Sequence, residues 1–281
     1  MKRTSEDLAK HTWLDIGGPA QIAIPESKDE FVDILTNSHK KGRSYRILGN
    51  GSNLLVSDEG VNDLVIKATE ACTTVSFDED HVQAGASVMI PQFINKCIHH
   101  NLGGYEYLYS VPGTIGGAIY MNAGRGKKHD KTISDYLLSV EVFDDGTVRE
   151  IPIKDLEFRH RYSIFQDNED WVILSAKFDP PEQDSDKGRQ KSQKRMQKVS
   201  ERERSKPNAG SVFQTGARLP LQKVPPDGLS VGNARFVSPN RICNDGDATF
   251  DDIKRLIILA KFLNKFIPPF RTPEVEWKIW E

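Results

Sequence analysis

Two short runs rich in glycine, asparagine, serine and threonine carry the residue types best suited to binding a phosphate. The longer is Ser110-Val-Pro-Gly-Thr-Ile-Gly-Gly-Ala-Ile-Tyr-Met-Asn-Ala-Gly124, and the shorter is Leu48-Gly-Asn-Gly-Ser-Asn-Leu-Leu-Val56. Glycine lets the main chain approach a ligand closely, and successive exposed N–H groups form a concave site for an anion such as a diphosphate. Together the runs predict a long phosphate-bearing ligand. The alternative is that both are tight turns in a β-rich domain.

Neither run fits the common nucleotide-binding patterns. The glycine fingerprint of the dinucleotide-binding βαβ fold opens a helix directly after a strand, whereas Leu54-Leu55-Val56 indicates another strand. The Walker pattern is absent, so we exclude both folds. Because the longer run holds four glycines and a proline, we expect it to form a loop.

Three further features carry polar side chains that could act on a substrate. They are Ser211 in Asn208-Ala-Gly-Ser-Val-Phe213, Arg161 in Phe158-Arg-His-Arg-Tyr-Ser-Ile-Phe165, and Glu274 in Thr272-Pro-Glu-Val275. Each alone also fits a structural role, as a turn serine, an ion-paired arginine and a solvated carboxylate. No Ser/His/Asp elbow, HExxH motif or Cys/His metal spacing is present, so we predict no metal site. By themselves, the residues predict a binder of a diphosphate cofactor and leave catalysis open.

The elements that must position these residues predict an α+β fold. A strand at 21–24, a helix from a Ser27 capping box to Gly42 and a strand at 45–48 mark a first subdomain, residues 1–67. Residues 68–181 form a second, in which one helix between Pro91 and Gly103 interrupts antiparallel strands. Cys97 lies on the apolar face of that helix, so we expect a core residue rather than a nucleophile. The strands are expected at 74–77, 81–84, 138–143, 147–152 and 171–178.

The remaining chain divides into a charged segment and a last domain. Residues 182–206 hold nine Lys or Arg but no aromatic residue to stack on bases, so we expect a solvated helix or linker rather than a nucleic-acid arm. Its end leaves Arg202, Arg204 or Lys206 available for a phosphate. Residues 207–281 carry a helix from Thr249 to the prolines at 268–269 and an alternating strand at 271–280.

Composition narrows the function classes further. The 281 residues include 38 basic and 40 acidic ones, a net charge of −2, so any nucleic-acid role would need a local patch. Three separate cysteines without a CxxC pair favour a reduced compartment. No apolar run approaches the roughly 18 residues of a membrane span. We expect a cytoplasmic monomer that binds a small molecule, neither a nucleic acid nor a membrane.

The motifs together resemble the UDP-N-acetylenolpyruvoylglucosamine reductases, also called UDP-N-acetylmuramate dehydrogenases. The match comprises the two glycine-rich runs, Ala209-Gly-Ser-Val-Phe213, Pro273-Glu-Val275 and His11-Thr-Trp-Leu-Asp-Ile-Gly-Gly-Pro-Ala20, all in the family's order. The resemblance implies an FAD-binding module of two α+β subdomains, like that of vanillyl-alcohol oxidase, followed by a substrate-binding α+β domain. It also implies the compact form of the family, without an inserted tyrosine loop.

The resemblance further implies a flavin reaction in two halves. NADPH would reduce a non-covalent FAD, and the enolpyruvyl nucleotide sugar would then take up the hydride. By match to the family, Arg161 and Glu274 would stabilise the charge that develops on the substrate, and Ser211 would supply the proton. Substrate contacts would come from Asn208, Gln214 and Asn240. The residues expected to bind the cofactor are Gly49, Asn50, Gly51, Ser52, Asn53, Leu54, Pro112, Gly113, Thr114, Gly116, Gly117, Ala118 and Asn122.

Several positions depart from the family's pattern, and all lie on the substrate side. His160 stands where tyrosine is common, Gln214-Thr215-Gly216 replaces Lys-Asn-Pro, and Ser238 stands where histidine is usual. Two alternatives therefore stay open. One is a flavin oxidoreductase of the same fold that acts on another nucleotide sugar or enol ether, and the other is a flavin-binding protein without turnover.

Overall fold

The computed structural model describes residues 2–125, 131–168, 170–199, 206–214, 228–266, 270 and 272–281. The chain forms two compact units with separate hydrophobic cores. The first unit comprises Met1–Thr4, Ile22–Asn50 and Asp63–Val199, and the second comprises Ser5–Gln21, Gly51–Asn62 and Ser200–Glu281. One passage of the chain between the units falls at Asn50 and Gly51, inside the shorter glycine-rich run.

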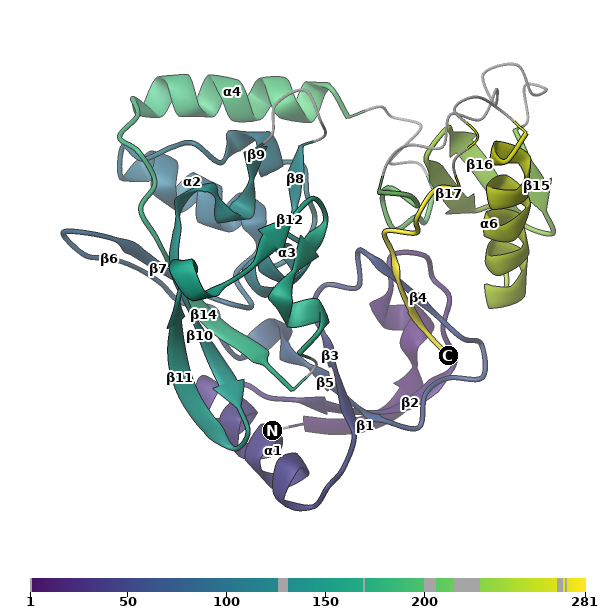
Figure 1. Cartoon of the computed structure of the whole chain (residues 1–281), viewed down its shortest axis with the longest axis horizontal. Coiled ribbons are helices and arrows are strands. Elements are labelled where there is room, and N and C mark those ends of the chain that lie inside the picture. The colour runs from purple at the N-terminus through teal and green to yellow at the C-terminus, as the bar shows by residue number, and fades with distance from the viewer. Residues whose placement is uncertain are drawn as a thin grey trace. The chain divides into compact units, whose positions relative to one another are not determined.

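Helices and strands both occur along the described chain, and several strands follow one another without a helix between them (Figure 1). The α-helices are α1 (Lys28–Lys40), α2 (Ile90–His99), α3 (Ile115–Tyr120), α4 (Ser185–Gln197) and α6 (Phe250–Asn264). The first nine strands are β1 (Lys2–Asp7), β2 (Pro19–Ile24), β3 (Tyr45–Leu48), β4 (Leu54–Val56), β5 (Leu64–Lys67), β6 (Val75–Phe77), β7 (Val82–Gly85), β8 (Gly124–Arg125) and β9 (Lys131–Thr132). The others are β10 (Leu137–Asp144), β11 (Thr147–Pro152), β12 (Phe158–Arg159), β13 (Tyr162–Ser163), β14 (Val172–Phe178), β15 (Ser230–Val231), β16 (Ala234–Ser238), β17 (Arg241–Asn244) and β18 (Lys278–Trp280).

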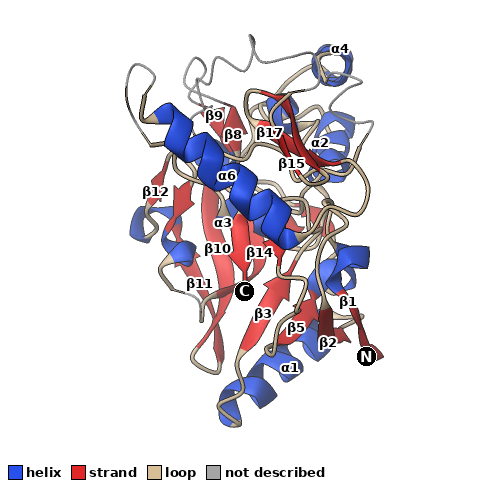
Figure 2. Ribbon diagram, turned by 90° about the vertical axis from the view of Figure 1, so that its right-hand side faces the viewer, coloured by secondary structure: helices blue, strands red, loops and turns tan. Residues whose placement is uncertain are grey.

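A five-stranded antiparallel sheet forms the centre of the first unit. Its order is β11-β10-β14-β7-β6, and the long strands β10, β11 and β14 run side by side in Figure 2. The predicted antiparallel strands are therefore confirmed. Val140 and Val142 of β10 are fully buried in the core that this sheet shares with α2 and α3. Cys97 of α2 is 2% exposed in the same core, which confirms it as a core residue.

A second sheet carries the strand that leads into the shorter glycine-rich run. Its order is β1-β2-β5-β3, and β3 and β5 pair in parallel from Tyr45 opposite Leu64. Helix α1 begins where the sequence predicts, because the Ser27 hydroxyl accepts a hydrogen bond from the Glu30 N–H at 3.2 Å. The Glu30 carboxylate bonds the N–H of Glu26 instead of closing the box at Ser27. The apolar face of α1 then packs on β5.

The longer glycine-rich run corrects one expectation, because part of it is a helix. Residues 115–120 form α3, and Thr114 caps this helix by accepting the N–H of Gly117 at 3.2 Å. Ile115 and Ile119 are fully buried in the core. Tertiary packing and the cap therefore outweigh the low helix propensity of two glycines, which is the reason that the prediction of a loop was wrong here.

The charged segment forms a helix that packs on its own unit. Helix α4 lies along α2, and both are visible together in Figure 1. Gly188 is the contact point, because a Cβ there would come within 2.9 Å of Ile98. Of the three cations predicted to reach a phosphate, Arg202 and Arg204 lie outside the described residues. The Lys206 ammonium lies 2.7 Å from Asp245 Oδ1.

The second unit is built on a three-stranded sheet and α6. The sheet order is β15-β16-β17, and α6 packs against β15 and β16. The predicted start of this helix at Thr249 is confirmed, because Thr249 and Asp252 exchange both hydrogen bonds of a capping box. The helix ends at Asn264, and the prolines predicted to stop it lie outside the described residues. None of the helices in the described chain has the length and apolar content that crossing a membrane requires.

The C-terminal segment is less regular than predicted. We expected one strand over 271–280, but only Lys278–Trp280 forms β18, and Arg271 lies outside the described residues. Strand β18 pairs in parallel with β4. Before it, Val275 makes an isolated antiparallel bridge with Phe213. The segment therefore pairs with two different partners, and this change of partner breaks the predicted continuous strand.

Candidate active site

The two glycine-rich runs meet in the first unit. The Asn50 side-chain amide donates a hydrogen bond to the Pro112 carbonyl at 2.6 Å. A Cβ atom at Gly49 would lie 3.2 Å from Thr114 Oγ1, so the main chain of one run lies against the cap of α3. We call the segments 49–54 and 112–118 the first and second loops. Within the first unit, residues 49 and 50 of the first loop thus lie against the second loop, although Asn50 and Pro112 are 62 residues apart in the sequence.

Main-chain N–H groups of these loops are available to a ligand. Within the part of the chain that the structure describes, six amides of the two loops donate to no acceptor. These are the amides of Asn50, Gly51, Ser52, Asn53, Gly113 and Thr114. Gly51 and Thr114 are buried residues, and a buried N–H without an acceptor is costly unless a ligand supplies one. Each loop therefore fits a ligand that carries acceptor oxygens, such as the diphosphate of a dinucleotide.

Other predicted cofactor residues have their main-chain amides engaged inside the protein. The Gly116 N–H donates to the Ala86 carbonyl at 2.9 Å, and the Ala118 N–H donates to the Thr114 carbonyl at 2.8 Å. A Cβ at Gly116 would stand 3.0 Å from the Ala86 Cβ, so a larger residue here would have to displace the chain after β7 by a few tenths of an ångström. Leu54 is buried in β4. These residues fix the shape of the loops, while Gly117 is exposed.

The first loop is also held by the segment at 11–13 in the second unit. Gly51 has φ +63°, and a Cβ on it would lie only 2.0 Å from the His11 carbonyl oxygen. The Trp13 N–H donates to the Gly51 carbonyl at 3.1 Å. A glycine is therefore required here by both the left-handed backbone and the contact with residue 11.

Arg161 occupies the turn of a short hairpin in the first unit. Strands β12 and β13 pair Arg159 with Tyr162, which leaves His160 and Arg161 as the turn. Arg161 has φ +57°, a left-handed conformation that costs a residue other than glycine about 1 kcal/mol or more. Strain of this kind at a polar residue is typical of functional sites. Beside it, a hydrogen bond to Asp167 raises the pKa of Tyr162.

Asn122 links the end of α3 to this hairpin. Its side-chain N–H donates to the Arg159 carbonyl at 2.8 Å, and its side-chain oxygen accepts from the Ser134 hydroxyl at 3.0 Å. Asn122 is only 4% exposed, and its side-chain amide group is engaged in hydrogen bonds with these two residues inside the protein. Its predicted contact with the cofactor stays a prediction; in the structure its side chain links the arginine turn to the end of α3, the helix that begins within the second loop.

Ser211 and Glu274 lie on paired segments of the second unit. The Gln214 N–H donates to the Glu274 carbonyl at 3.0 Å, and the Glu276 N–H donates to the Val212 carbonyl at 2.7 Å. Together with the bridge between Phe213 and Val275, these bonds place the serine and glutamate segments side by side. Ser211 is half-buried and Glu274 is exposed. Arg161 belongs to the first unit and the other two to the second.

The two asparagines predicted to contact substrate brace the serine segment. Asn240 accepts the Phe213 N–H and donates to the Phe213 carbonyl, both at 2.8 Å. The Asn208 side-chain oxygen accepts from the Gly210 N–H at 3.2 Å and from Arg241 Nη1 at 2.7 Å. Gln214 lies on the same segment, and Thr215 and Gly216 after it fall outside the described residues. These bonds fix the main chain on both sides of Ser211.

Sequence reasoning missed the side chains that hold the arginine turn. The Ser163 hydroxyl donates to the Tyr120 carbonyl at 2.7 Å. The Gln166 amide donates to the carbonyls of Tyr120 and Arg161 at 3.0 and 3.1 Å. Nothing in the local pattern marks these residues, because their partners are main-chain carbonyls that only the fold brings near.

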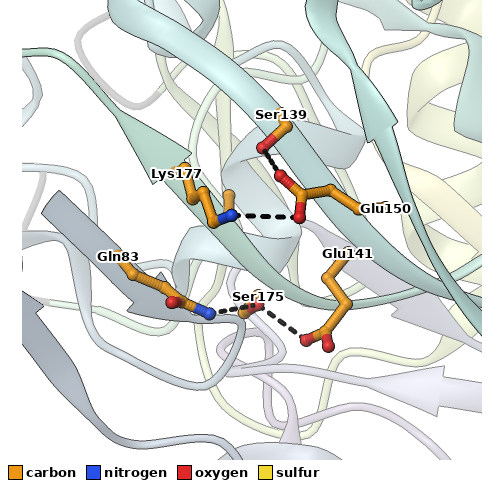
Figure 3. Close-up of a pocket in the computed structure, with 7 residues that line it drawn as sticks. Gln83, Ser139, Glu141, Glu150, Ser175 and Lys177 are labelled. Atoms are coloured by element: carbon orange, nitrogen blue, oxygen red, sulfur yellow. Dashed lines mark hydrogen bonds and ion pairs between the residues drawn. The ribbon is translucent and has the colours of Figure 1, made fainter. Parts of the chain in front are cut away.

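A separate polar hollow of about 110 Å³ lies on the five-stranded sheet (Figure 3). Its lining is Gln83, Ser139, Glu141, Glu150, Ser175, Ala176 and Lys177. The hydroxyl of Ser139, followed by Lys177, lowers the pKa of Glu150 by hydrogen bonding, and Lys28 lies 2.7 Å from Glu141. Both carboxylates are thus neutralised by neighbours. In the described residues no group of three His, Cys, Asp or Glu side chains could hold a metal ion.

The fold and the two loops define an FAD-binding protein. Residues 19–151 match the family model of the FAD binding domain, which confirms the predicted fold class and cofactor. The relatives extend over nearly the whole chain. UDP-N-acetylenolpyruvoylglucosamine reductases from Alkaliphilus oremlandii and Caldanaerobacter subterraneus subsp. tengcongensis are 34% and 32% identical, over 91% and 90% of this chain and 86% and 85% of theirs.

A solved structure agrees with this assignment. The crystal structure of UDP-N-acetylenolpyruvylglucosamine reductase (MurB) from Thermus caldophilus matches with a TM-score of 0.81 and 27% identity, over 100% of both chains. The chain belongs to the UDP-N-acetylenolpyruvoylglucosamine reductase family and is an FAD-dependent oxidoreductase. The family resemblance found in the motifs is confirmed.

Proposed function

We propose that the protein reduces the enolpyruvyl group of UDP-N-acetylenolpyruvoylglucosamine to give UDP-N-acetylmuramate, a step of peptidoglycan precursor synthesis in the cytoplasm. NADPH would be the hydride donor, and FAD when bound supplies a carrier that accepts hydride from one substrate and gives it to the other. The observation that supports this most directly is the meeting of two loops with amides open to a ligand, in a chain whose relatives are these reductases over about nine-tenths of its length.

The chain's own residues have distinct roles in this proposal. The amides of the first and second loops bind the FAD diphosphate, and Gly49 and Gly116 let the main chain pack closely enough to form the cradle. The Arg161 guanidinium stabilises the negative charge that develops beside the substrate carboxylate as hydride arrives, and Glu274 assists as a hydrogen-bond donor, a role that requires its carboxyl group to carry a proton. Losing one donor aimed at such a charge typically costs about 3 to 4 kcal/mol.

Ser211 completes the reduction as general acid. Its hydroxyl donates a proton to the substrate carbon next to the one that received hydride. Proton transfer by a positioned group contributes roughly 10²- to 10⁴-fold to rate. Asn240 supports this role, because its two hydrogen bonds to Phe213 hold the serine segment rigidly.

The test separates the two half-reactions. Purified protein should show the visible absorption of oxidised flavin. Under anaerobic conditions, adding NADPH should bleach this absorption by reducing the flavin, and adding UDP-N-acetylenolpyruvoylglucosamine should restore it by reoxidising the flavin. In Ser211→Ala, the rate of flavin reoxidation by this sugar should fall by about 10²-fold or more, while the rate of bleaching by NADPH stays within about twofold of wild type.

A wild-type protein that bleaches with NADPH but is not reoxidised by this sugar would instead favour the second candidate, a flavin oxidoreductase acting on another nucleotide sugar. The changes at Gln214 and Ser238 are what support that candidate.

A further inference from the structure

The turn that carries Arg161 needs support from outside the hairpin. Its two-residue loop puts Arg161 at φ +57°, where a side chain other than glycine is strained. Strands β12 and β13 contribute only two residue pairs, Phe158 with Ser163 and Arg159 with Tyr162. So short a hairpin is marginal by itself, and its geometry must be fixed by the structure around it.

The support comes from the C-terminal end of α3. The carbonyl of Tyr120, the last residue of α3, accepts hydrogen bonds from Ser163 and Gln166. Carbonyls at a helix C-terminus lack intrahelical partners and carry partial negative charge, so they are good acceptors for side-chain donors. The Gln166 amide uses its second N–H on the Arg161 carbonyl at 3.1 Å. One amide thereby ties the strained residue to the helix.

We propose that Gln166 is a positioning residue that sets the placement of Arg161 relative to the second loop. Helix α3 begins at the second loop, and its far end holds the arginine through Gln166. The same rigid element therefore sets both the cofactor cradle and the residue that stabilises charge on the substrate. This inference rests on the proposed function for its kinetic consequence, but not for the structural one.

The chemistry of residue 166 decides which replacements can work. Glutamine presents two N–H donors to two carbonyls. Glutamate has nearly the same shape but, when ionised, only accepts, so it would face both carbonyls with negative charge. Lysine carries three donors and no acceptor, so it can bond the same carbonyls. Gln166→Glu should thus release the turn, and Gln166→Lys should keep it.

Asn168 provides a matched control on the same segment. Its side-chain amide also donates to a main-chain carbonyl, that of Ile164 at 2.9 Å, and this partner belongs neither to α3 nor to the turn. Asn168→Asp makes the same amide-to-carboxylate change two residues away. A general loss of local packing would affect Asn168→Asp and Gln166→Glu alike, whereas a loss of positioning would affect Gln166→Glu alone.

The experiment combines hydrogen exchange with half-reaction kinetics on the purified full-length protein. In Gln166→Glu, the peptide covering residues 157–166 should exchange faster than in wild type, without any substrate present. Reoxidation by the enolpyruvyl nucleotide sugar should slow by roughly 10- to 100-fold, because small displacements of a catalytic group cost rates of this order. FAD content and bleaching by NADPH should stay within about twofold, and Gln166→Lys and Asn168→Asp should resemble wild type throughout.

Two results would overturn the inference. One is unchanged exchange of residues 157–166 in Gln166→Glu. The other is equal slowing of both half-reactions in Gln166→Glu and Asn168→Asp, which would indicate a structural role only. If wild-type protein itself does not reduce this sugar, the proposed function fails, and the exchange data alone still decide whether Gln166 holds the turn.

Discussion

Replacing Gly51 with alanine should both destabilise the protein and weaken FAD binding. Gly51 has φ +63°, and an added Cβ would stand 2.0 Å from the His11 carbonyl oxygen and 3.0 Å from Thr12 Cα. Both neighbours are main-chain atoms, so no side chain can rotate away to make room. The segment at 11–12 or the loop itself must move. Since the first loop supplies amides to the proposed cradle, either movement disturbs the cofactor site.

Gly42 gives a control that isolates the clash. Its φ is +58°, nearly that of Gly51, but a Cβ there would meet nothing within 4 Å. The left-handed backbone alone should cost Gly42→Ala about 1 to 2 kcal/mol of unfolding free energy. Forced packing typically adds about 1 to 3 kcal/mol. Gly51→Ala should therefore lose about 2 to 5 kcal/mol, the sum of both effects.

Two measurements test this reasoning. Urea unfolding of the FAD-free variants gives the two stability losses, and titration of the FAD-free protein with FAD gives the affinities. Gly42→Ala should bind FAD as wild type does, while Gly51→Ala should bind at least about tenfold more weakly, which corresponds to about 1.4 kcal/mol. Equal stability losses in the two variants, or unchanged FAD affinity in Gly51→Ala, would refute the argument from the His11 contact.

Three further outcomes are expected. Burial raises the pKa of the Cys97 thiol to about 12, so this thiol should resist a thiol-specific reagent at neutral pH until the protein is unfolded; rapid labelling of native protein at this position would contradict its burial. Hydrogen bonds from Ser44 and then Arg46 lower the pKa of Asp63. The ionised Asp63 carboxylate therefore adds to the free energy of unfolding, fully at a pH above the ordinary aspartate pKa, and this contribution is lost as the pH falls through the lowered pKa. Asp63→Asn should accordingly flatten the acid end of the stability curve measured by urea unfolding from about pH 6 down to about 2, and an unchanged slope would count against the depressed pKa. Asn240→Ala should cost about 1 to 3 kcal/mol, because it leaves two main-chain groups of the serine segment unsatisfied, and thermal unfolding that matches wild type would exclude this bracing role.

Local patterns in the sequence are enough to predict the regular elements. The Thr249 capping box, the strand over 45–48 and the strand over 147–152 are observed with the predicted bounds or caps, because hydrophobic periodicity and caps act over a few residues. Helix α3 escapes prediction because its stability comes from the burial of Ile115 and Ile119, which local propensity does not record. The roles of Ser211, Arg161 and Glu274 remain predictions.

The sequence by itself determined the family, the FAD-binding fold class and which two runs of glycine are suited to a phosphate, since these depend on residue type and order along the chain. Only the tertiary structure decided what touches those residues. It brought Asn50 to Pro112, paired the Ser211 and Glu274 segments, and placed Gln166 against Tyr120 and Arg161. Apart from the bond between Gln166 and Arg161, these contacts join groups far apart in sequence, and each involves a main-chain group. Because nearly every residue has the same main-chain groups, residue type alone cannot specify which of them meet.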